Sequence, residues 1–92
     1  MNATEILRDA ADIIEQRAII RDLPDGERSM CRAVKMFNAA KGYGLSEFDG
    51  WIFMCCLKIS RATAGNTHPD DFMDLAGYAA LAGESAGVDK DD

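Results

Sequence analysis

Four charged side chains in the second half of the sequence have types and spacings that suit phosphate and metal chemistry. Lys58 and Arg61 are three residues apart, and Asp71 and Asp74 repeat that spacing after a Gly-Asn-Thr-His-Pro segment. In a helix, side chains three residues apart lie on neighbouring turns of one face. Two cations beside two carboxylates can bind a phosphate and a divalent metal, and they can equally form ordinary salt bridges between helices. The sequence leaves both interpretations open.

The net charge limits the classes of partner. The chain has 16 acidic and 10 basic residues and a formal net charge of −6, and its cations are scattered. Duplex nucleic acid is bound through many Lys and Arg contacts to phosphates, so a nucleic acid polymer is not an expected partner. An acidic protein that handles a free nucleotide needs a divalent ion between its carboxylates and the phosphates, and Mg²⁺ typically fills that role.

Length and cysteine content indicate one small intracellular domain. The 92 residues have room for a single hydrophobic core, expected over 1–86, with a frayed polar tail over 87–92. The three cysteines do not make a disulfide framework, which fits a reducing cytosol. The N-terminus lacks a signal-peptide pattern, and the longest apolar run, 51–57, is far shorter than the roughly 20 residues that cross a bilayer. A soluble protein that makes no membrane contact is expected.

Apolar residues recur at helical spacing in two segments of the first half of the chain. The first predicted helix covers 3–21, and Asn2 with Glu5 has the spacing of a capping box at its start. The segment 22–26 contains a proline and a glycine, which break the helix. The second predicted helix covers 27–40. Its expected inner stripe consists of Met30, Ala33, Val34 and Phe37.

The third predicted helix, 46–64, begins at a second cap-like pair, Ser46 and Asp49, and ends before Gly65. Its centre, 51–57, is apolar on every face, which for a helix indicates burial on all sides. A buried strand also fits a short apolar run, but Met, Leu and paired Cys residues favour the helix.

The fourth predicted helix begins near Pro69, a favourable first helical residue. Gly77 inside it costs about 1 kcal/mol relative to Ala, so another backbone is expected to pass close to it. No strand signal interrupts this pattern. The sequence therefore predicts an all-α, four-helix bundle-like fold in which the third helix is central and buried.

Burial of the third helix on all sides is demanding for a chain of this length. Three neighbouring helices cover only part of its surface, so we expect a homodimer with this helix at or near the interface. The alternative is a monomer in which Trp51 and Met54 stay partly exposed.

Several segments together resemble a group of small phage and prophage proteins of uncharacterised function. That group is similar to the phage nucleotide-modification-associated helical domains and, more distantly, to the MazG-like all-α nucleoside triphosphate pyrophosphohydrolases. The resemblance implies a protein that works in the cytoplasm of a bacterial host. The segments that carry it are Asp25-Gly-Glu-Arg-Ser29, Phe37-Asn38, Leu57-Lys-Ile-Ser-Arg-Ala62 and Asp70-Asp-Phe-Met-Asp-Leu-Ala-Gly-Tyr-Ala-Ala80.

The resemblance implies a metal site. MazG-like enzymes hold Mg²⁺ with a Glu-x-x-Glu motif on one helix and a Glu-x-x-Asp motif on another. The second motif is echoed here by Asp71 and Asp74, but Glu27 is followed at the matching spacing by Met30. Glu27, Asp71 and Asp74 are thus the expected metal ligands, because Mg²⁺ accepts few carboxylates when phosphates and waters complete its shell. Asp49 or Asp70 is the alternative to the missing acid.

The other roles follow from the same site. Lys58 and Arg61 would neutralise phosphate charge and Tyr78 would stack on the base, while no catalytic base is assigned. The expected function is Mg²⁺-dependent nucleotide binding. Its stronger form is hydrolysis of a (deoxy)nucleoside triphosphate to monophosphate and pyrophosphate. The alternative is a noncatalytic helical interaction protein on a degenerate MazG-like scaffold, which binds a host protein.

Each candidate also has a purely structural interpretation. Acids at the start of a helix, such as Glu27 and Asp71, stabilise the helix dipole, and Asp74 can pair with Lys58 or Arg61 between helices. The Tyr78 ring can pack in the core. Two further groups have no expected chemistry: the only histidine, His68, fits a cap or solvent contact, and Cys55-Cys56 fits two buried thiols.

Overall fold

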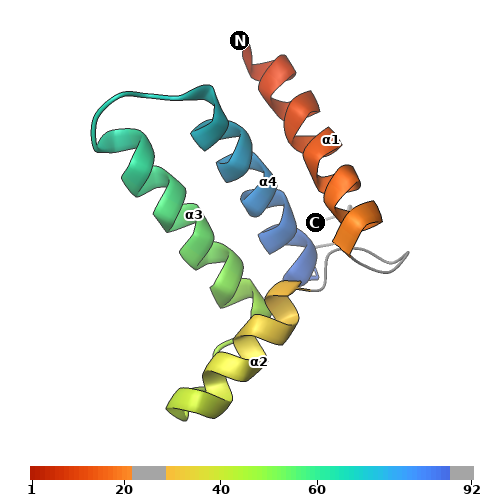
Figure 1. The fold of residues 1–92 in the computed structure, drawn as a ribbon, viewed down its shortest axis with the longest axis vertical. Coiled ribbons are helices and arrows are strands. Elements are labelled where there is room, and N and C mark those ends of the chain that lie inside the picture. Colours follow the sequence, from red (N-terminus) through yellow and green to blue (C-terminus); the bar gives the residue numbers. More distant parts are fainter. Residues whose placement is uncertain (22–28, 88–92) are drawn as a thin grey trace.

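The computed structural model describes residues 1–21 and 29–87 and places them in four helices (Figure 1). These are α1 (Ala3–Arg21), α2 (Ser29–Lys41), α3 (Glu47–Thr63) and α4 (Pro69–Ser85). No strand occurs among the described residues, so the predicted all-α class is confirmed. The expected break at 22–26, the position of Glu27 and the polar end of the tail at 88–92 lie outside the described residues.

The helices begin where capping chemistry predicts. At the start of α3, the Ser46 hydroxyl accepts a hydrogen bond from the Asp49 backbone N–H at 3.1 Å, and the Asp49 carboxylate accepts one from the Ser46 N–H at 2.9 Å. This reciprocal capping box satisfies two backbone donors that the first turn leaves unpaired. At the start of α1, Asn2 Oδ1 accepts from the Glu5 N–H at 2.8 Å. Local side chains thus define these two helix starts.

Three of the helices form one layer. α4 lies between α1 and α3 and packs against both, while α2 extends away from the end of this layer and packs against the start of α3 (Figure 1). None of the described helices combines the length and the apolar character that a membrane span requires.

The core lies along α4. The buried apolar side chains of the core are Ala10 on α1, Trp51 and Cys55 on α3, and Ala82 on α4. The Trp51 ring is only 6% exposed and stacks on Tyr78, with centroids 5.8 Å apart and an interplanar angle of 27°. Trp51 joins α3 to α4 in this way, but α4, which packs against both α1 and α3, is the central helix of the layer.

The prediction that α3 is buried on all sides is wrong for the single chain. α3 is not buried on all sides, because α4 and the start of α2 cover only one side of it. The opposite side exposes Ile52 (41%), Phe53 (70%) and Ile59 (50%). Trp51, which was expected to stay partly exposed in a monomer, is buried instead.

The backbone approach expected at Gly77 does not occur, and the tightest side-chain contact at a described glycine is at Gly50. A Cβ placed on Gly77 would lie 3.7 Å from the Ile14 side chain, an ordinary contact that involves no other backbone. A Cβ on Gly50 would lie 2.5 Å from Met30 Sδ and 2.9 Å from Val34 Cγ2. α2 crosses α3 at Gly50, so the missing side chain there sets how closely the two helices approach.

The predicted inner stripe of α2 is only half correct. Met30 and Val34 face α3 at Gly50, but Ala33 and Phe37 are exposed. The reason is that α2 has one neighbouring helix in the layer and meets it with one edge of its apolar surface. No residue of α2 is buried.

Candidate functional site

Packing of α3 against α4 brings together two of the predicted site residues. Lys58 Nζ lies 2.9 Å from Asp74 Oδ2, and the two side chains are only 12% and 20% exposed. Both lie on the mutually facing sides of their helices, at the positions that helical spacing assigns to the buried stripes. The pairing with Lys58 that sequence analysis left open for Asp74 is therefore present. A partly desolvated pair of this kind interacts more strongly than a surface ion pair.

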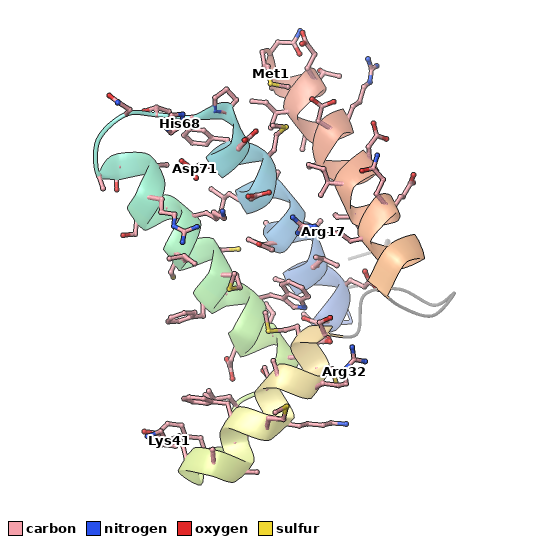
Figure 2. All side chains as sticks on the ribbon, in the orientation of Figure 1. Met1, Arg17, Arg32, Lys41, His68 and Asp71 are labelled. Carbon is pink, nitrogen blue, oxygen red and sulfur yellow. The ribbon has the colours of Figure 1, made fainter. Side chains whose placement is uncertain are left out.

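The other two candidates, Asp71 and Arg61, each lie one helical turn away from the Lys58–Asp74 pair. Asp71 lies one turn before Asp74 and occupies the space between the start of α4 and the end of α3 (Figure 2). Arg61 lies one turn beyond Lys58 and is exposed. Because α3 and α4 run in opposite directions, Arg61 near the end of α3 and Asp71 at the start of α4 lie at the same end of this helix pair (Figure 1).

A small hollow opens beside this contact, where α1, α3 and α4 meet. Its cavity volume is about 30 Å³, enough for only about two waters. Asp74 and Tyr78 contribute to its wall, and Arg17 extends toward α4 from α1 (Figure 2). The full lining is Ala10, Ile13, Ile14, Arg17, Trp51, Met73, Asp74, Gly77, Tyr78 and Leu81. Ligand pockets usually enclose about 300 Å³ or more, so a whole nucleoside does not fit inside the hollow of one chain.

Arg17 is the residue of this region that sequence reasoning missed. Its position follows Ile13 and Ile14 on the buried stripe of α1, and its side chain is half-buried. A cation on an apolar stripe is the signal that would have identified it, since charged residues reach such positions only with polar surroundings.

The remaining candidate residues, Tyr78, His68 and Cys55, lie at packing or helix-cap positions. The Tyr78 ring stacks on Trp51 and is half-buried. His68 occupies the cap position of α4, but its side chain makes no capping hydrogen bond. Burial raises the pKa of the Cys55 thiol above its ordinary value, and the neighbouring Cys56 adds to the effect. A thiol that resists ionisation is a poor nucleophile and a poor metal ligand.

Two of the three expected metal ligands, Asp71 and Asp74, lie among the described residues. Within residues 1–21 and 29–87, no group of three His, Cys, Asp or Glu side chains is arranged to hold a metal ion. Glu27, the third expected ligand, lies outside the described residues. The described residues therefore provide two acids, Asp71 and Asp74, and one of them is already paired with a cation.

Fold and site together define a small all-α domain with a charged contact between its two central helices. The chain belongs to a family described as a domain of unknown function (DUF6378), whose model matches residues 5–86. No curated protein matches the chain. No solved structure matches it either.

Proposed function

We propose that the charged side chains at the α3–α4 contact bind a nucleotide through Mg²⁺. One observation supports this function: a cation of α3 and an acid of α4 meet between the two helices, with Lys58 Nζ 2.9 Å from Asp74 Oδ2. Asp71 and Asp74 would supply carboxylate oxygens to the metal, and phosphates and waters would complete its octahedral shell. Lys58 would exchange Asp74 for a phosphate oxygen as the metal binds, and Arg61 would add a second cation.

The finer parts of the proposal come from the resemblance to MazG-like enzymes. Glu27 would be a third metal ligand and Tyr78 would stack on the base. Hydrolysis to a monophosphate and pyrophosphate would be the stronger form of the activity. A phage or prophage origin and work in the cytoplasm of a bacterial host belong to the same proposal. Because the hollow beside Tyr78 is small, the base would bind at the surface of the chain or against a second chain.

Calorimetry with a panel of nucleoside triphosphates, with and without Mg²⁺, tests this function. Asp71→Asn should abolish Mg²⁺-dependent binding without breaking the Lys58–Asp74 pair. Glu84→Gln is the control, because it makes the same charge change at an exposed position near the other end of the same helix. A pyrophosphate-release assay on the wild-type chain then tests hydrolysis. Equal weakening by the two substitutions would contradict the proposed ligand, because it would indicate only a change in overall charge.

The second candidate is a noncatalytic interaction protein, and one observation favours it. Met30 stands where the resemblance expects an acid, and its sulfur packs beside Gly50 at the crossing of α2 and α3. The position therefore serves helix packing. The absence of heat with any nucleotide, with or without Mg²⁺, would favour this candidate over the first.

A further inference from the structure

Two exposed apolar stripes are left over when the chain folds. We define the α2 stripe as Ala33, Met36, Phe37 and Ala40, and the α3 stripe as Phe48, Ile52, Cys56 and Ile59; all eight residues are exposed. The spacings of three and four residues place each set along one side of its helix. Isolated exposed apolar residues are ordinary, but stripes with helix-packing periodicity indicate surfaces that pack against another helix.

The α2 stripe is held in a fixed orientation by its own turn. Asn38 Nδ2 donates a hydrogen bond to the Leu45 carbonyl at 2.8 Å, and the Leu45 N–H donates to Asn38 Oδ1 at 3.0 Å. Gly42 takes a positive φ of 73°, and the ring centroids of Phe37 and Tyr43 lie 5.8 Å apart. α2 therefore projects from the three-helix layer in a defined direction, as Figure 1 shows. A preorganised surface loses little conformational entropy when it binds.

The exposed side chains of the two stripes are large and apolar. Five of them are 39–72% exposed: Met36 (72%), Phe37 (46%), Phe48 (39%), Ile52 (41%) and Ile59 (50%). Apolar side chains gathered in this way on one surface indicate a partner that covers them.

Charge indicates that the partner is a second copy of the chain. α2 carries three cations, Arg32, Lys35 and Lys41, and no acid. The whole chain has 16 acids and 10 cations, so its remaining residues hold 16 acids and seven cations, a net charge of −9. The rest of a second copy is thus electrostatically complementary to α2.

Charge also selects α3 as the surface of the second copy that α2 contacts. Two α2 helices would bring six cations together, whereas α3 begins with Glu47 and Asp49 next to its own exposed stripe. We therefore propose that the α2 stripe of each copy packs on the α3 stripe of the other. One two-fold axis generates both contacts and covers all four stripes of the pair. Met and Phe are among the residues enriched in such interfaces.

Sedimentation equilibrium and light scattering test this interface. The wild-type chain should have twice the monomer mass of 10.0 kDa. Met36→Glu and Ile52→Glu should each weaken dimerisation by roughly 100-fold or more, because each places two charges in an apolar interface. Leu7→Glu is the control. Leu7 is 61% exposed, between Ile52 (41%) and Met36 (72%), but it lies on α1, outside both stripes, so its substitution should leave the mass unchanged.

Cross-linking tests the pairing of stripes without relying on a destabilising substitution. Met36→Cys should form an intermolecular disulfide with Cys56 of a second copy under mild oxidation, and Cys56→Ser should remove that product. Leu7→Cys should give none.

Three outcomes would overturn the interface. One is a monomeric wild-type chain, which would leave the stripes to a different protein. Another is a dimer that survives both Met36→Glu and Ile52→Glu. The third is a cross-link from Met36→Cys that persists in the Cys56→Ser background, because it would indicate another pairing of helices. None of these measurements involves a nucleotide, so a result that overturns the interface leaves the proposed nucleotide binding untouched.

Discussion

The two helices that pack against α3 do so in different ways. Against α4, α3 buries Trp51 and Cys55 and forms a half-buried ion pair, Lys58–Asp74. Against α2, it makes a short crossing at Gly50 and leaves the apolar stripe of α2 in solvent. Both neighbours have amphipathic sequences. This difference shows that an apolar stripe predicts packing against a partner. The arrangement of the helices decides whether that partner belongs to the same chain.

The largest expected effect contrasts the two sides of α3. Trp51→Ala should cost about 3–5 kcal/mol, because it removes a buried ring and its stacking on Tyr78. Phe53→Ala, at a position 70% exposed, should change stability by no more than about 0.5 kcal/mol. Urea denaturation followed by circular dichroism measures both. Similar losses from the two substitutions would show that the outer side of α3 is buried as well.

The next effect concerns the ion pair of the α3–α4 contact. Asp74→Ala should cost about 2 kcal/mol, between the values for surface and fully buried pairs, because it leaves Lys58 unpaired in a partly desolvated position. Lys58→Met combined with Asp74→Leu should recover most of that loss, since no unpaired charge remains. A double-mutant cycle measured by denaturation gives the coupling. Additive effects of the two positions would show that the pair contributes no net stability.

A smaller effect separates the crossing at Gly50 from an open glycine of α4. Gly50→Ala should destabilise by about 1 kcal/mol, because overpacking against Met30 and Val34 outweighs the gain in helix propensity. Gly83→Ala adds the same methyl where no atom lies within 4 Å and should stabilise by about 0.5–1 kcal/mol. Thermal melts of the two variants check the signs. A stabilised Gly50→Ala variant would mean that α2 can move away from α3 at little cost.

The smallest effect contrasts the adjacent thiols of α3. Burial raises the pKa of Cys55 above its ordinary value of 9.0, and Cys56 raises it further. The unfolded chain therefore releases this proton at a lower pH than the folded chain does. The contribution to stability is present below pH 9.0 and is lost as the pH rises through the folded-state pKa.

Denaturation curves between pH 8 and 10 measure this slope. Cys55→Ala should remove part of the alkaline decline, while Cys56→Ala should retain most of it, since burial of Cys55 is the larger cause. An unchanged decline in Cys55→Ala would assign the alkaline effect to other groups.

Much of the helical pattern was predictable from local sequence. The Ser46–Asp49 capping box and Pro69 marked helix starts, and apolar periodicity gave the extent of α1 and α3. A pair between a cation of the third helix and Asp74 was one interpretation of the spacing, because residues three apart on one helix share a face. The Lys58–Asp74 partnership required the packing of α3 on α4, since Arg61 was an equally plausible partner from spacing alone.

The sequence by itself determined where helices begin and which residues share a face, because capping and periodicity act within a few residues. Only the tertiary structure decided that Gly50 marks the helix crossing, that Arg17 extends toward α4, and that Ala33 and Phe37 face solvent. These outcomes depend on which helices become neighbours and at what angle. Contacts between residues far apart in the chain set that geometry, and amphipathic patterns of similar quality allow several arrangements.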